Sequence, residues 1–213
     1  MAAPDARGAS TRRQLLDAGR EIVRKRGFQS LTVRGVAAAS GANLGSFVYH
    51  FRTRDAFIAA LLEDWYAPLM DSLEHVAESH GTALERLRRA ILQLVDFGAE
   101  HEMFVGRVLM AAANGDPAAR RFARSLAGRH PRLLVSLVTA AGSAGEIVAE
   151  HPLQLLCFLM SSVGLPRLLA SAWHGPPLFD RDLAATLGQI ARDRDRIVQR
   201  LDWAIAGIRI RGM

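Results

Sequence analysis

Cysteine is almost absent from this chain of 213 residues, with Cys157 as its single representative. One cysteine cannot form a disulfide framework or a cysteine-based metal cluster. Cys157 lies in the apolar run Leu155–Met160, where we expect a small buried core residue. Uncharged stretches are short as well, since the run from Pro152 to Pro166 cannot span a bilayer as a helix. The N-terminus lacks the apolar core of a signal peptide, so we expect a cytoplasmic protein.

Motifs for catalysis and cofactor binding are also missing. The sequence contains no phosphate-binding loop and no His-Glu-x-x-His pair, and residues 141–145 lack the first glycine of a nucleophile elbow. His75 and His80 are five residues apart, which does not place them on one helix face as a metal pair. We therefore expect no enzyme activity, no cofactor and no metal site.

Lysine is nearly absent too, because Lys25 is the only one. Alanine, leucine and arginine dominate, and β-branched residues form no alternating runs of the kind that strands require. Half of the residues are hydrophobic and 23% are charged, which is typical of a soluble globular protein. This composition predicts an all-α fold.

The positive charge is concentrated at one end of the chain. Residues 1–54 carry ten basic and three acidic side chains, a balance of +7, whereas the whole chain has +6. A basic end joined to a nearly neutral body is typical of nucleic-acid binding at that end. A solvated basic face would show the same charge pattern, so charge alone leaves both interpretations open.

Capping and apolar periodicity predict four helices in the N-terminal third. A capping box at Thr11–Gln14 opens the first helix, which ends at Gly27. Thr32 and Asn43 are N-caps for short helices that reach Gly41 and Phe51. The fourth helix follows Thr53, and Pro68 should kink or end it.

The remainder of the chain predicts further helices and no strands. They cover about 82–99, 102–113, 117–140 with an interruption at Pro131, 152–173 and 181–209. This organisation divides the chain into a short basic unit, residues 1–54, and a larger helical body, residues 55–213.

The segment from Thr32 to Phe51 has the features of a helix-turn-helix. Ala37 is small where the two helices would meet, and Gly41 suits the positive φ of the turn between them. Val36 and Phe47 supply apolar contacts that would lock the pair. In this motif the second helix enters the major groove of DNA.

The sequence LTVRGVAAASGANLGSFVYHF at residues 31–51, followed by RTRD, resembles the DNA-binding domain of TetR-family repressors. The resemblance covers about residues 11–65, and beyond them it extends only to helix number and length. It implies an N-terminal helix-turn-helix domain and a larger C-terminal ligand-binding and dimerisation domain. The implied function is a repressor that binds a palindromic operator as a homodimer and is released by a small, largely apolar effector.

The resemblance also implies roles for individual residues in DNA binding. Base edges would be contacted by Arg34, Leu44, Gly45 and Val48, and phosphates by Thr32, Ser46, Tyr49, His50 and Arg54. Val48 stands where the family usually has an aromatic residue, and Leu44 and Gly45 have no hydrogen-bonding side chain. We therefore expect Arg34, Asn43 and methyl contacts with thymine to read the sequence.

Packing is the alternative role for some of these side chains. We expect Phe51 to be a packing residue, whereas the basic neighbours of Tyr49 and His50 favour phosphate contact. Arg12 and Arg13 are expected to act only through long-range electrostatics.

Two apolar stripes in the body are candidates for the dimer interface. The predicted interface residues are Leu156, Leu159, Val163, Ile190, Ile197, Leu201 and Ile205. Both stripes could instead face the core of their own subunit, or each could contribute both to that core and to the dimer interface. The family resemblance favours an interface of four helices.

Large adaptable side chains in the middle of the chain are candidates for an effector pocket. They are Trp65, Phe97, His101, Met103, Phe104, Met110 and Phe122. Pockets between helices are mainly apolar with a few polar groups, which fits this set. The alternative is a DNA-binding regulator whose body serves dimerisation or a protein partner and has no small-molecule switch.

Overall fold

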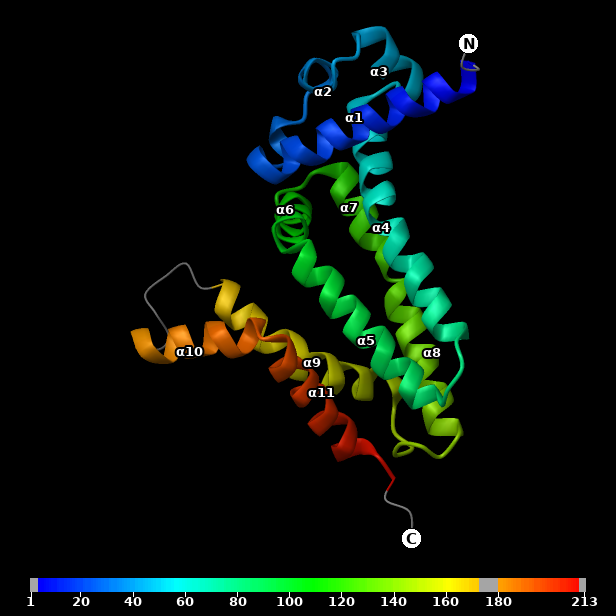
Figure 1. Ribbon diagram of the computed structural model, residues 1–213, viewed down its shortest axis with the longest axis vertical. Coiled ribbons are helices and arrows are strands. Elements are labelled where there is room, and N and C mark those ends of the chain that lie inside the picture. The colour runs from blue at the N-terminus through cyan, green and yellow to red at the C-terminus, as the bar shows by residue number, and fades with distance from the viewer. Residues whose placement is uncertain (1–3, 173–179, 211–213) are drawn as a thin grey trace. The chain divides into compact units, whose positions relative to one another are not determined.

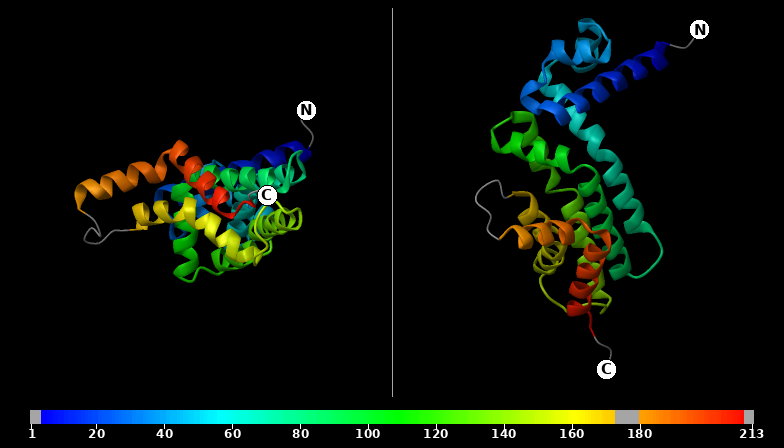
Figure 2. Two further views of the ribbon diagram at one scale, coloured as in Figure 1. Left: turned by 90° about the horizontal axis from the view of Figure 1, so that it is seen from below. Right: turned by 60° about the vertical axis from the view of Figure 1, so that its left-hand side comes forward.

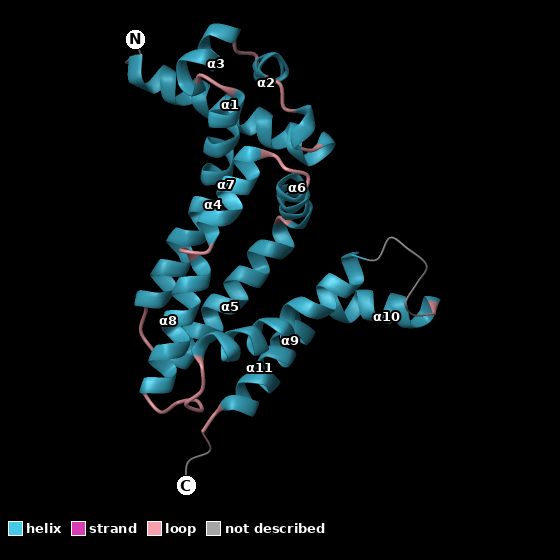
Figure 3. Cartoon of the chain, turned by 180° about the vertical axis from the view of Figure 1, so that it is seen from behind, coloured by secondary structure: helices cyan, strands magenta, loops and turns pink. Residues whose placement is uncertain are grey.

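The protein is helical throughout the residues that the structure, a computed structural model, describes, which are 4–172 and 180–210. The one β interaction among them is an isolated bridge between Ile147 and Arg209. These residues therefore confirm the predicted all-α fold, and short loops join the helices (Figure 3). None of the described helices is long and apolar enough to cross a membrane.

The described elements follow one another along the chain as labelled in Figure 1. They are α1 (Pro4–Arg26), the 3-10 helix η1 (Phe28–Ser30), α2 (Val33–Ser40), α3 (Leu44–Phe51), α4 (Arg54–Glu78), α5 (Ala83–Glu100), α6 (Glu102–Ala113), α7 (Pro117–Leu126), α8 (His130–Ser143), α9 (Pro152–Ala172), α10 (Arg181–Arg192) and α11 (Arg194–Ile208).

The chain forms two compact units, which do not coincide with a simple cut along the sequence. The N-terminal unit comprises Met1–Met70 and His101–Gly128, and the second unit comprises Asp71–Glu100 and Arg129–Met213. The boundary predicted after residue 54 therefore falls inside the N-terminal unit.

Several helix ends differ from their predicted positions. The first helix begins at Pro4, so Thr11 lies inside α1 and the capping box predicted there is wrong. Helix α4 continues past Pro68 to Glu78, so this proline does not end it. The predicted helix 117–140 is two helices, and Pro131 occupies the first turn of α8, where its missing N–H costs no hydrogen bond.

The predicted helix 181–209 is also divided, at Asp193. The carboxylate of Asp193 accepts hydrogen bonds from the backbone N–H groups of Asp195 and Arg196, at 2.9 and 3.2 Å. It therefore caps α11 while its own backbone, with ψ of 117°, ends α10. The apolar period continues across this break, which explains why it predicts one helix.

The core of the N-terminal unit is formed by α1, the helix-turn-helix and the start of α4. Phe57 lies at its centre, with ring centroids 5.1 Å from Phe47 and 4.9 Å from Phe51. A Cβ on Gly19 would lie 2.7 Å from Cε1 of Phe57, closer than packed atoms allow. Glycine at this position lets α1 approach α4 closely enough to bury the three rings.

In the second unit, α9 lies beside α8, α10 and α11 (Figure 2). The buried side chains of these helices are apolar, and charged pairs lie at the surface. Arg88 donates to both carboxylate oxygens of Asp202, at 2.6 and 3.0 Å, and Asp202 raises the pKa of the Arg88 guanidinium by accepting these bonds. Glu146 accepts hydrogen bonds from the first N–H groups of α5. Cys157 is exposed on α9, so the expectation of a buried core residue is wrong.

Candidate nucleic-acid interface

Helices α2 and α3 form a helix-turn-helix whose local geometry follows from its capping residues. The hydroxyl of Thr32 accepts a hydrogen bond from the backbone N–H of Gly35 at 3.0 Å and so caps α2. Gly41 ends α2 with φ of 73° and ψ of 5°, the left-handed conformation that was expected there. Both caps are confirmed, and Val36, Ala37 and Phe47 are buried between the helices as predicted.

Helix α3 exposes apolar side chains that a folded domain would ordinarily cover. Leu44 is 46% exposed and Val48 48%, and because they are four residues apart they share one face of the helix. Gly45, which is also exposed, lies beside them. The part of α3 predicted to meet base edges is therefore accessible and apolar.

Asn43 caps α3, and this role limits the hydrogen-bonding groups that its side chain can present to a base. Its side-chain oxygen accepts hydrogen bonds from the backbone N–H of Ser46 at 2.7 Å and from the Ser46 hydroxyl at 3.1 Å. A bidentate contact with adenine needs both the oxygen and the nitrogen of the amide. With the oxygen engaged as an N-cap, Asn43 retains only its two N–H donors for a base.

The side chains predicted to hold phosphates lie at both ends of the motif. Thr32 is exposed before α2, and its hydroxyl proton stays available while its oxygen serves as the cap. Tyr49 is 81% exposed at the end of α3, and its ring meets that of His50 edge-on, with centroids 5.0 Å apart. Phe51 is buried against Phe47, which confirms the packing role expected for it.

Arg34 points into solvent from the first turn of α2. No carboxylate among the described residues pairs with it, so its five N–H donors remain available. By contrast, Arg24 and Lys25 near the end of α1 hydrogen-bond Glu21 and lower the pKa of its carboxyl to about 2. Positive charge is thus neutralised along part of α1 and left free on α2.

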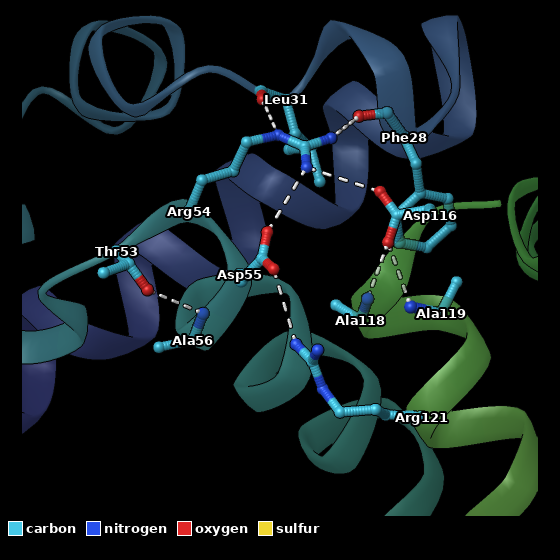
Figure 4. Close-up of polar contacts among 10 residues, drawn as sticks. All are labelled: Phe28, Leu31, Thr53, Arg54, Asp55, Ala56, Asp116, Ala118, Ala119 and Arg121. Carbon is cyan, nitrogen blue, oxygen red and sulfur yellow. Dashed lines mark hydrogen bonds and ion pairs between the residues drawn. The ribbon is translucent and has the colours of Figure 1, made fainter.

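Arg54 has a different position from the one that a phosphate contact requires (Figure 4). Its Nε donates to the carbonyl oxygen of Leu31 at 2.7 Å, and its Nη2 donates to that of Phe28 at 2.8 Å. Its Nη1 lies 3.3 Å from Oδ2 of Asp116. Since all three nitrogens are engaged within the chain, we correct the prediction and assign Arg54 the task of fixing the start of α4.

Asp116 is the partner of Arg54, and its double role was not predicted from the sequence. One carboxylate oxygen accepts hydrogen bonds from the N–H groups of Ala118 and Ala119, both at 3.0 Å, and so caps α7. The other oxygen binds Arg54 (Figure 4). An aspartate directly before Pro117 is a helix-start signal, but it does not reveal a partner 62 residues away.

Aromatic rings link the 3-10 helix to α4, α6 and α7 within the N-terminal unit. The ring centroid of Phe104 lies 6.0 Å from Phe28 and 4.8 Å from Trp65. Trp65 lies 6.4 Å from Phe122 and meets His101 edge-on at 6.0 Å. These four predicted pocket residues (Trp65, His101, Phe104 and Phe122) therefore come together in one cluster.

Two further predicted pocket residues of the N-terminal unit are exposed on α6. Met103 and Met110 are 57% and 62% exposed, whereas Phe104 on the same helix is buried. Phe97 belongs to the second unit and is half-buried. The periodicity of α6 does not show which of its apolar faces is turned inward, so the exposure of the two methionines could not be predicted.

The predicted dimer residues are mostly buried within their own subunit. Those with 7% exposure or less are Leu156, Leu159, Val163, Ile197, Leu201 and Ile205, and only Ile190 is exposed. The apolar residues that α9 and α11 do expose are Leu153, Phe158, Leu165, Leu169 and Trp203. Of the two alternatives for the stripes, their own core is the one that the structure supports.

Comparison with known proteins agrees with this architecture. Residues 15–61 match the family of bacterial regulatory proteins described as the tetR family. The HTH-type transcriptional repressor KstR2 of Mycolicibacterium smegmatis is 29% identical over 87 residues, which are 40% of this chain and 42% of the relative. The match therefore spans less than half the length of this curated relative.

Solved structures show the same fold over nearly the whole chain. FadR from Bacillus subtilis in complex with stearoyl-CoA has a TM-score of 0.66 at 15% identity and covers 92% of this chain and 98% of its own. A transcriptional regulator from Saccharomonospora viridis in complex with choline has a TM-score of 0.69 at 16% identity, covering 95% and 100%. PfmR from Thermus thermophilus, a TetR-family regulator, has a TM-score of 0.59 at 18% identity, covering 84% and 97%. The segment of residues 15–61, which contains the helix-turn-helix, is therefore similar to the tetR family of bacterial regulatory proteins.

Proposed function

We propose that this protein is a transcription regulator that binds a palindromic DNA operator as a homodimer and is released by a small effector. The observation that carries the proposal is the exposed surface of α3 within a capped helix-turn-helix. The second helix of this motif enters the major groove with its N-terminal residues nearest the bases. The name of the KstR2 relative supports the role of a repressor rather than an activator.

The surface formed by α3 and Arg34 would recognise bases mainly by apolar contacts, with only a few hydrogen-bonding groups. Leu44 and Val48 suit the methyl group of thymine, and Arg34 suits the O6 and N7 acceptors of guanine. Asn43 would donate from its amide nitrogen. Thr32, Tyr49 and His50 would bind phosphates and fix the position of α3 along the groove. Ser46 would join them by turning its hydroxyl proton from Asn43 to a phosphate oxygen.

The dimer interface is proposed on the faces that α9 and α11 leave exposed. Phe158, Leu165 and Leu169 lie on one side of α9, opposite its buried side. Trp203 of α11 is 64% exposed, and its neighbours Ala206 and Gly207 are small enough for another helix to approach. A two-fold axis would pair each face with its own copy and place two α3 helices on half-sites about 34 Å apart.

The effector site is proposed beside the aromatic cluster of the N-terminal unit. Trp65, Phe104 and Phe122 provide large apolar faces, and His101 provides a polar group. Aromatic faces bind acyl chains by apolar contact and quaternary ammonium groups through the ring quadrupole. The stearoyl-CoA and choline complexes of the two structural relatives make these compounds the first effectors to test.

Release of DNA would follow from a population shift between two states. Phe104 contacts Phe28 just before α2, and Asp116 contacts Arg54 at the start of α4. An effector that favours a different position of α6 and α7 would thereby move residues 53–66 and the helix-turn-helix with them. The free energy that the effector contributes to DNA release equals the difference between its binding free energies for the two states.

The experiment is a fluorescence-anisotropy titration of the full chain with double-stranded DNA from upstream of its own gene. We expect binding that weakens steeply with salt and is lost in the double variant Arg34→Gln/Tyr49→Phe, whose two side chains are exposed. Arg124→Gln, an exposed substitution on α7, is the control for a general loss of charge. Absence of salt-dependent binding by the wild-type protein contradicts the proposed function. Stearoyl-CoA and choline are then added to the complex, and if neither they nor other apolar acyl compounds release the DNA, the effector part fails.

A further inference from the structure

The N-terminal turns of α1 lie beside the end of α3. Helix α1 begins at Pro4, well before residue 15, where the match to the family begins. A Cβ on Gly8 would lie 3.9 Å from Cε1 of His50, so the second turn of α1 contacts the end of α3. Figures 1 and 2 show these turns of α1 extending past α3. Tyr49 and His50 therefore share their surface with residues that precede the helix-turn-helix.

Arg12 is the cation that this part of α1 presents to that surface. Its guanidinium carbon lies 5.5 Å from the ring centroid of Phe51, within the range of a cation–π interaction. Phe51 is buried, whereas Arg12 is exposed. The ring thus holds the guanidinium at the end of α3 while its N–H donors stay accessible to solvent.

The charge of Arg12 is not neutralised by a neighbouring carboxylate. Four other basic residues of α1 have such a partner: Arg13 with Asp17 at 3.6 Å, Arg20 with Asp64 at 2.6 Å, and Arg24 and Lys25 with Glu21 at 2.7 and 2.9 Å. No carboxylate among the described residues lies within ion-pair distance of Arg12. A fixed, unneutralised guanidinium over Phe51, at the end of the helix that carries exposed Tyr49 and half-buried His50, is suited to bind an anion.

We propose that Arg12 binds a phosphate of the operator next to those held by Tyr49 and His50. This inference rests on the proposed DNA binding and adds a contact from outside the family-matched segment. It replaces the expectation that Arg12 acts only through long-range electrostatics. Each phosphate contact releases about 0.9 counterions, so two copies in a dimer would contribute about 1.8 to the salt slope.

The test compares the salt dependence of DNA binding for matched variants of the full chain. The association constant for the operator is measured at several KCl concentrations for the wild type, Arg12→Gln, Arg12→Lys and Arg13→Gln. We expect Arg12→Gln to make the slope of log K against log salt shallower by about 1.8. Arg12→Lys should keep the wild-type slope of log K against log salt because it keeps a positive charge at position 12. Arg13→Gln removes the same charge from the adjacent residue and should change the slope much less.

Each outcome separates this inference from the proposed function. If wild-type protein binds DNA with a steep salt dependence and Arg12→Gln has the same slope, the Arg12 contact is overturned and the function stands. If Arg12→Gln and Arg13→Gln flatten the slope equally, Arg12 acts through its field alone and the inference is again overturned. If the wild type does not bind DNA, it is the proposed function that fails. Thermal melting of Arg12→Lys and Arg12→Gln shows whether loss of the ring contact unfolds the domain.

Discussion

The Nε of Arg200 donates a hydrogen bond of 3.0 Å to the backbone carbonyl oxygen of Ser162. In a regular helix that carbonyl would accept from the residue four positions later, but this residue is Pro166, which has no N–H. Arg200 of α11 therefore supplies the donor that α9 lacks. Its Nη1 also donates to the carbonyl oxygen of Ile190 at the end of α10. One side chain thus completes the hydrogen bonding of two other helices.

Replacing Arg200 by Leu should destabilise the second unit. The substitution leaves the partly buried carbonyl group of Ser162 without its donor, at a cost of about 1–3 kcal/mol, whereas the exposed carbonyl group of Ile190 can bond water instead. For a chain of this size each kcal/mol lowers the melting temperature by about 2–4 °C. Differential scanning calorimetry measures the effect, with Arg192→Leu, an exposed substitution on α10, as the control.

A second substitution identifies the cause of that destabilisation. Pro166→Ala returns an N–H to α9, which can then bond the Ser162 carbonyl directly. Arg200→Leu should therefore cost less in the Pro166→Ala background than in the wild type. Equal costs in both backgrounds would show that the Ser162 contact contributes nothing to stability.

Asp116 should show separable contributions to stability from its two carboxylate oxygens. Asparagine retains a good N-cap for α7 but loses the ion pair with Arg54, whose side chain is 33% exposed. We therefore expect Asp116→Asn to cost less than about 1 kcal/mol, because partly exposed ion pairs contribute little. Asp116→Ala loses the cap as well and should cost about 1 kcal/mol more. Urea unfolding at fixed pH measures both free energies.

The same pair of variants tests the proposed coupling between effector and DNA. If the Arg54 contact carries part of the switch, Asp116→Asn should change the effector concentration needed for half-release of DNA. Its affinity for DNA without effector serves as the reference measurement. An unchanged release curve would exclude the Arg54–Asp116 contact from the switch.

The parts of this structure that could be predicted from sequence are those that depend on neighbours along the chain. Thr32 and Asn43 each bond an N–H three residues later, so their roles as caps are visible in local patterns. Arg54 could not be placed in this way, because its partners lie 23, 26 and 62 residues away. The same holds for α9, since an amphipathic pattern shows that one face is buried but not against what. Leu159 was therefore assigned to a partner subunit when it belongs to the core of its own.

Substitutions of Asn43 should separate folding from base reading. Asn43→Ser keeps an N-cap oxygen for the Ser46 N–H but removes the amide donors, so the melting temperature should stay within about 2 °C. If Asn43 donates to a base, the affinity for the operator falls by a factor of about 5–150 and one base position becomes less specific. Asn43→Ala, which loses the cap as well, should also lower stability by about 1 kcal/mol. Equal operator preference in Asn43→Ser and wild type, measured by selection from random DNA, would remove Asn43 from the base-reading set.

Substitutions on the exposed faces of α9 and α11 should disrupt the dimer without unfolding the subunit. Trp203 and Leu165 are 64% and 49% exposed in a single chain, so an arginine at either position meets solvent there rather than the core. In a symmetric interface this arginine would face the equivalent arginine of the partner subunit. The free-energy cost of burying two like charges exceeds the stabilisation that packing at the interface provides. We expect Trp203→Arg and Leu165→Arg to halve the mass measured by light scattering and to weaken operator binding strongly. Leu109→Arg, equally exposed but on α6, is the control and should leave the mass unchanged. If both α9 and α11 variants remain dimeric, the subunits associate through another surface.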